Sequence, residues 1–76
     1  MDTLKRLLAT ILNIDYENVD DSLSRENSED WDSFNHLMLM SEVEKQFHVS
    51  FSLQEIENVK TYADIRNLIR VKLEQG

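Results

Sequence analysis

The distribution of glycine and proline constrains the fold of this chain more than any other feature. Proline is absent from its 76 residues, and the only glycine is Gly76. Hairpin turns and glycine-rich phosphate-binding loops need glycine, because it adopts backbone conformations that other residues avoid. Neither element is expected in this chain. The composition therefore favours an all-α protein.

Size and composition bound the architecture further. A chain of this length forms one domain, here residues 1–76, and its hydrophobic content of 41% is typical of a globular protein. Cysteine is absent, which excludes disulfides and thiolate metal sites. No apolar run reaches the roughly 18 residues of a membrane-spanning helix. An amphipathic pattern begins directly after Met1, so we expect no signal peptide and a cytoplasmic monomer.

Four segments have the apolar spacing or the capping residues of helices, and they cover residues 3–13, 33–47, 53–58 and 62–74. One face of the first segment is apolar and consists of Leu4, Leu7, Leu8, Ile11 and Leu12. The last segment has a similar face, with Tyr62, Ile65, Leu68, Ile69 and Leu73. We predict a small bundle of three main helices plus one short helix.

Side chains suited to helix N-caps precede these segments. Asp2 or Thr3 can cap the first helix, and Asp32 can cap the second. Capping boxes are expected where a serine or threonine precedes an acid by three residues, in the pairs Ser52–Glu55 and Thr61–Asp64. These residues predict where the helices begin.

A long polar stretch, residues 14–32, separates the first two helices. Loops of this length are uncommon in small domains and are usually functional or disordered. Ile14, Val19 and Leu23 are spaced like anchors onto a core, so we predict an ordered loop on the surface. Trp31 is expected to pack the end of this loop against the bundle.

The net charge of −7 is unevenly distributed. Residues 15–57 contain twelve acids and two bases, which makes the middle of the chain −10 and leaves +3 for the two ends. Such a chain repels nucleic acid and anionic membranes. It attracts basic protein surfaces, and the attraction speeds association.

The helix predicted over residues 33–47 has two apolar stripes. The core stripe consists of His36, Leu39, Met40, Val43 and Phe47. The second stripe consists of Phe34, Leu37 and Met38 and ends at Ser41. Either Phe34 and Met38 cover the long loop, or the second stripe docks a partner. We favour a docking surface, because methionine adapts to several partners.

The start and end of this helix resemble the acyl carrier protein family. Asp32-Ser33-Phe34 opens the helix where the family has its aspartate-serine-leucine attachment motif. The helix ends in Glu42-Val43-Glu44-Lys45-Gln46-Phe47, as in family members. An acidic chain of about eighty residues with a long first loop and a short third helix also matches the family. The resemblance covers essentially the whole chain.

The resemblance implies a non-enzymatic carrier with a covalent cofactor. A phosphopantetheinyl transferase would move 4′-phosphopantetheine from coenzyme A to Ser33. The thiol of the arm would then hold an acyl or aminoacyl group as a thioester, loaded by a ligase and passed to a downstream synthase or transferase. The family also implies that Asp32 helps to bind the magnesium ion of the transferase, besides its expected role as an N-cap.

Departures from the family pattern indicate a specialised pathway. Phe34 replaces the usual leucine, and Asn35 and Met38 stand where carriers of fatty acid synthesis usually have acids. Fewer acids mean less electrostatic steering and more apolar contact. The expected partner-binding residues are Asp32, Phe34, Leu37, Met38, Ser41, Glu42, Glu44, Glu55 and Glu57. The cargo, whether for fatty acid, polyketide or nonribosomal peptide biosynthesis, is left open.

Other functions receive less support from the sequence. Ser33 and His36 could form a nucleophile pair, but no orienting carboxylate or oxyanion hole accompanies them, so we expect His36 to be structural or to contact the cofactor arm. The acidic loop lacks the glycine and the alternating acids of a calcium site, and no metal ligands are predicted. His48 is assigned no role. A helical adaptor that binds a basic partner through residues 33–47, without modification, remains the alternative function.

Overall fold

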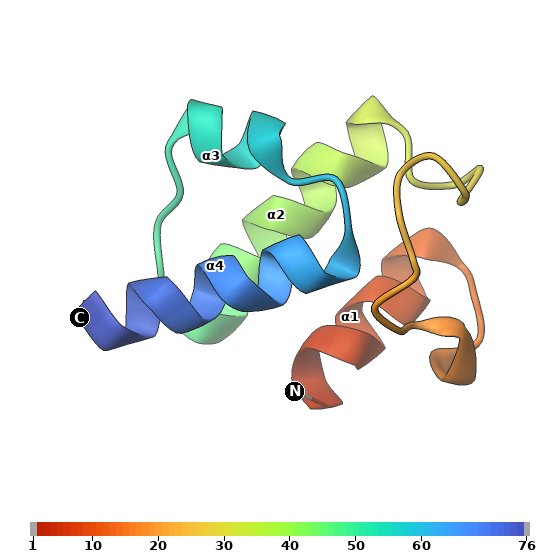
Figure 1. The fold of residues 1–76 in the computed structure, drawn as a ribbon, viewed down its shortest axis with the longest axis horizontal. Helices are drawn as coiled ribbons and strands as arrows, with labels where there is room; N and C mark the ends of the chain where they lie inside the picture. Colours follow the sequence, from red (N-terminus) through yellow and green to blue (C-terminus); the bar gives the residue numbers. More distant parts are fainter. Residues whose placement is uncertain (1, 76) are drawn as a thin grey trace.

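The predicted helices form over nearly the predicted residues. The computed structural model describes residues 2–75, in which the elements are α1 (Asp2–Leu12), the 3₁₀ turn η1 (Tyr16–Asn18), α2 (Ser33–Phe47), α3 (Leu53–Asn58) and α4 (Tyr62–Gln75). Figure 1 shows α1, α2 and α4 as the body of the bundle, with α3 lying across one side. The all-helical bundle with one short helix is thus confirmed.

Local hydrogen bonds explain where the helices begin. The Asp32 side chain accepts from the Asn35 N–H at 2.8 Å and caps α2. Both predicted capping boxes are present, with donor–acceptor distances of 2.8 and 3.1 Å in the first and 3.0 and 3.2 Å in the second, in the pairs Ser52–Glu55 and Thr61–Asp64. The predicted cap of α1 is wrong, because Asp2 and Thr3 both lie inside the helix, and the cap position falls outside the described residues.

The C-terminal ends of α1 and α2 adopt a backbone conformation that usually requires glycine. Asn13 and His48 have φ angles of 56° and 55°, in the left-handed region. The next N–H group in each case reaches back five residues, from Ile14 to Ala9 at 3.0 Å and from Val49 to Glu44 at 3.2 Å. These bonds are the signature of the Schellman motif. His48 therefore has a backbone role that its sequence context did not indicate.

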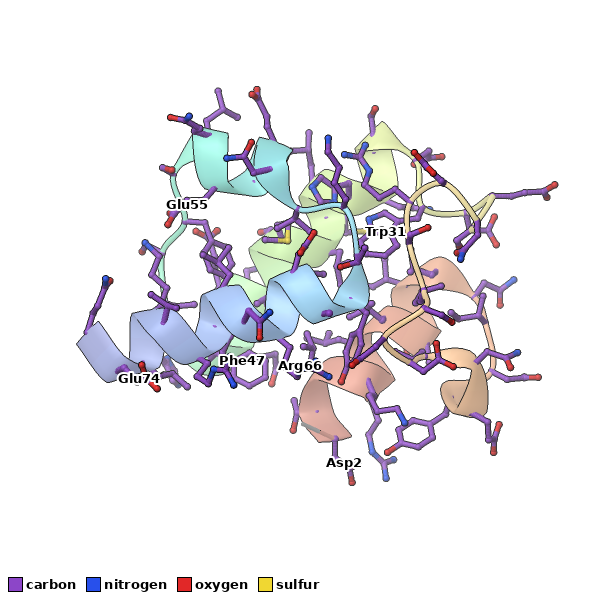
Figure 2. All side chains as sticks on the ribbon, in the orientation of Figure 1. Asp2, Trp31, Phe47, Glu55, Arg66 and Glu74 are labelled. Carbon is purple, nitrogen blue, oxygen red and sulfur yellow. The ribbon has the colours of Figure 1, made fainter. Side chains whose placement is uncertain are left out.

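The core lies where α1, α2 and α4 meet, and the long loop closes one end of it. Its apolar members are buried: Leu4, Leu8, Leu12, Val19, Leu23, Trp31, Leu39, Met40, Val43, Val59, Tyr62, Ile65 and Ile69. The core stripe predicted on α2 is therefore correct, with Phe47 partly buried beside it. Figure 2 shows the labelled Trp31 between the loop and the start of α2, as the sequence predicted.

The long loop is ordered by contacts at both its apolar and its polar residues. Val19 and Leu23 are buried and Ile14 packs against the core, which confirms all three anchors. The loop also pairs with the connection between α3 and α4, because an isolated antiparallel bridge joins Ser24 to Thr61. This tertiary pairing fixes the approach of the loop to the N-terminus of α2.

Candidate functional site

Ser33 is the first residue of α2 and is exposed. The loop before it is held by Asn35, whose side-chain amide donates to the Asp30 carbonyl at 2.7 Å. The N–H groups of Ser33 and Phe34 have no hydrogen-bond acceptor within residues 2–75. Free N–H groups and the positive end of the helix dipole favour an anionic substituent here. The site thus fits a phosphodiester on the serine hydroxyl.

His36 lies one turn after Ser33 and joins three parts of the chain. The Trp31 indole Nε1–H donates to His36 Nδ1 at 2.9 Å, and His36 Nε2 lies 2.7 Å from the carbonyl oxygen of Ile56 on α3. An indole only donates, so Nδ1 must be the acceptor and Nε2 must carry the proton. The imidazole is therefore neutral and has both nitrogens engaged.

This hydrogen bonding excludes His36 as a base for Ser33. Burial lowers the pKa of His36, and the nearby positive charges of Arg25 and Lys60 lower it further, although the Ile56 carbonyl acts in the opposite direction. His36 has no lone pair left to accept the proton of Ser33. The structural interpretation of His36 is thus supported over the nucleophile pair.

An open groove begins at Ser33 and runs between α2 and α3. Its apolar lining comes from both helices, in Leu37, Leu53 and Ile56, and His36 also borders it. Its charged lining consists of Arg25 from the loop, Glu57 from α3 and Lys60 after it. A flexible arm attached to Ser33 would find both apolar and charged surface within this groove.

The second stripe of α2 faces outward. The exposed fractions of Phe34, Leu37 and Met38 are 74%, 55% and 40%, and Ser41 is also exposed. The interpretation in which Phe34 and Met38 only cover the loop is therefore wrong. Leu53 on α3, 67% exposed, adds a residue that sequence reasoning missed, since a six-residue helix shows too little periodicity to assign its faces.

The four predicted partner-binding glutamates differ in their surroundings. Glu44 accepts from the Phe51 N–H at 2.8 Å, and Glu42 lies 3.5 Å from the ammonium group of Lys45. Glu55 takes part in its capping box and in an ion pair with Lys72 at 3.0 Å, and the Ser52 backbone N–H is the main reason that its pKa is lowered. Of these four carboxylates, only that of Glu57 has no polar partner within residues 2–75.

Comparison with known proteins identifies the family. A family model described as a phosphopantetheine attachment site matches residues 2–69. The chain belongs to this family of carrier proteins. The solution NMR structure of a holo acyl carrier protein from Geobacter metallireducens has the same fold as this carrier, with a TM-score of 0.84 at 24% sequence identity, over 97% of this chain and 85% of that one. No curated protein sequence matched this chain.

Family membership establishes the general role. The chain is a carrier protein with the acyl carrier protein fold rather than an enzyme, and its cofactor is 4′-phosphopantetheine, attached covalently. Within residues 2–75, no helix of this carrier has the length and apolar character needed to cross a membrane. No group of three or more histidine, aspartate or glutamate side chains converges on a metal-sized site in the same range.

Proposed function

We propose that this carrier bears its 4′-phosphopantetheine arm on the hydroxyl oxygen of Ser33. The observation that carries the proposal is the position of Ser33, exposed at the first turn of a capped helix with free N–H groups beside it. When the transferase uses coenzyme A as donor, the Ser33 oxygen would form a P–O bond to the phosphorus that bears the pantetheine arm, and the hydroxyl proton would pass to a base. The P–O bond within the diphosphate of coenzyme A would break, and adenosine 3′,5′-bisphosphate would leave. The attached arm supplies a thiol that holds acyl or aminoacyl groups as thioesters, which the cysteine-free chain cannot supply itself.

We propose that the base for this transfer comes from the transferase. His36 is the histidine nearest to Ser33 along α2, and both of its ring nitrogens are engaged in hydrogen bonds. Asp32 uses Oδ1 to cap α2, while Oδ2 has no partner within residues 2–75. We propose that this free oxygen faces the magnesium ion of the transferase. Capping and metal binding are then compatible, because they use different oxygens.

We propose that partner enzymes dock on the exposed apolar stripe beside Ser33. The docking surface consists of Phe34, Leu37, Met38, Ser41 and Leu53. Four large apolar side chains grouped at one end of a small domain form a larger exposed apolar patch than scattered surface residues would form. Glu57 lines the groove beside this surface, and Glu42 follows Ser41 on α2, so both can steer basic enzymes toward it. Glu44 and Glu55 are bound to their own chain, so we expect them to contribute less than the sequence alone suggested.

We further propose that the partners belong to a specialised pathway rather than to general fatty acid synthesis. Phe34, Asn35 and Met38 give the docking helix an apolar and uncharged first half. A test is to supply the loaded carrier to an extract that contains a fatty acid synthase. Slow or absent chain extension is expected, and efficient extension would contradict the proposal.

Intact-protein mass spectrometry tests the attachment itself. The chain is incubated with coenzyme A and a broad-specificity phosphopantetheinyl transferase, and a mass increase of one phosphopantetheinyl group is expected. Ser33→Ala should abolish the increase. Ser50→Ala is the matched control, because Ser50 is an exposed serine in the connection after α2, and it should load fully. Loading of Ser33→Ala would overturn the assignment.

A further inference from the structure

Two cations face each other where the long loop pairs with the connection between α3 and α4. The bridge between Ser24 and Thr61 is antiparallel, with hydrogen bonds from Arg25 N–H to Lys60 O at 2.9 Å and from Tyr62 N–H to Leu23 O at 3.1 Å. In this register Arg25 lies directly opposite Lys60. Like charges opposite each other across a strand pair are destabilising. The register therefore places two like charges on neighbouring segments.

The two cations are not neutralised by the surplus of acids. Three other basic residues have carboxylate partners, in the pairs Lys45–Glu42, Arg66–Asp21 and Lys72–Glu55. Lys5 and Arg6 instead lie over the Tyr16 ring, and Arg70 contacts Asn67. Arg25 has no carboxylate within ion-pair distance in residues 2–75. The ammonium group of Lys60 donates only to a backbone carbonyl, that of Glu57, at 3.3 Å. In a chain with a net charge of −7, two neighbouring cations without a carboxylate partner indicate an anionic ligand.

Both cations line the groove that begins at Ser33. Arg25 borders it from the loop and Lys60 from the connection before α4, while the carboxylate of Glu57 also lies along it. The balance of these three charges is positive. The unpaired N–H groups of Ser33 and Phe34 add the positive end of α2 to the same region.

We propose that Arg25 and Lys60 hold the phosphodiester of the cofactor arm on Ser33. The inference rests on the proposed attachment to Ser33. A guanidinium presents a planar fork of donors to phosphate oxygens, and an ammonium group supplies a compact charge, so the two complement each other. The phosphodiester neutralises part of the repulsion between them. The arm then starts along the groove toward Leu37, Leu53 and Ile56 rather than into solvent.

The first test compares the thermal stability of the unloaded and loaded forms. Loading the native chain should raise Tm by about 3–6 °C, and high salt should reduce this gain. Arg25→Gln and Lys60→Gln should each lose at least half of the gain. Arg70→Gln is the matched control, because Arg70 is an exposed cation on α4 whose guanidinium contacts only Asn67, and it should keep the full gain. An unchanged gain in Arg25→Gln would overturn the inference.

The second test needs no variant. The Nε–Hε resonance of Arg25 should shift on loading in a ¹⁵N NMR spectrum, while that of Arg70 should stay in place. Intact mass is recorded first, so the two proposals fail in different ways. A native chain that does not load contradicts the attachment to Ser33 and this inference together. A fully loaded chain in which the Arg25 resonance does not move overturns this inference alone.

Discussion

The hydrogen bond between Trp31 and His36 should be measurable as a coupling energy. Both side chains are buried, at 2% and 4% exposed, and the bond length is 2.9 Å. His36→Leu leaves the Trp31 indole N–H buried without an acceptor, which costs about 1–3 kcal/mol. The same variant loses the bond to Ile56 O, worth about 1 kcal/mol, although that carbonyl keeps a weak bond from Val59 N–H at 3.4 Å. We expect a total loss of about 2–4 kcal/mol.

Trp31→Phe leaves the complementary defect. His36 Nδ1 loses its donor, and the smaller ring leaves space at the end of the loop, so we again expect a loss of about 2–4 kcal/mol. A domain of this size has a free energy of unfolding of about 4–11 kcal/mol, so a loss of about 2–4 kcal/mol leaves each single variant folded over most of that range. The double variant has neither the unsatisfied donor nor the unsatisfied acceptor. Its loss should therefore be smaller than the sum of the single losses by about 1–2 kcal/mol.

Urea unfolding followed by circular dichroism measures these energies without relying on the single tryptophan. The measurements are made above pH 7, where free histidine is neutral. A control cycle pairs Trp31→Phe with His48→Asn, because His48 is exposed and asparagine tolerates its left-handed backbone. The control cycle should be additive within about 0.5 kcal/mol. Additivity in the Trp31–His36 cycle as well would refute the proposed tautomer and the network built on it.

Two further predictions concern the histidines. Burial lowers the pKa of His36 in the folded chain, so the unfolded chain takes up a proton first, near pH 6.5. The free energy of unfolding should therefore fall as the pH drops through about 6.5, by at most about 1.4 kcal/mol per pH unit. His36→Gln should remove this slope from the urea midpoints and His48→Asn should retain it; a slope that persists in His36→Gln would contradict the assignment. His48→Gly should raise the free energy of unfolding by about 1 kcal/mol and Tm by about 4–8 °C, because glycine adopts the positive φ without strain. A rise in Tm no larger than that of His48→Ala would contradict this explanation.

Local signals made much of this fold predictable. Helix starts depend on residues close in sequence, so Asp32 and the two capping boxes could be recognised from the order of the amino acids alone. The core stripe of α2 followed from its periodicity. Ser33 could be singled out because a motif, a cap and a helix start coincide at one position.

Features that depend on distant segments were not predictable. The bridge of Ser24 to Thr61 joins residues far apart in the chain, and no local pattern marks it. The Arg25–Lys60 pair is a consequence of that bridge and remained hidden for the same reason. The tautomer of His36 follows from its contact with the Trp31 indole, and its second partner lies on α3, so neither contact could be read from the sequence. His48 was missed because only its φ angle reveals its role.

The central claim is that one serine, at the start of α2, carries the cofactor. Peptide fragmentation of the loaded native chain tests it most directly, because it assigns the added phosphopantetheinyl mass to a residue without any substitution. Fragment ions should place the whole added mass on Ser33. Added mass on another serine, such as Ser28 in the loop or Ser41 further along α2, would contradict it.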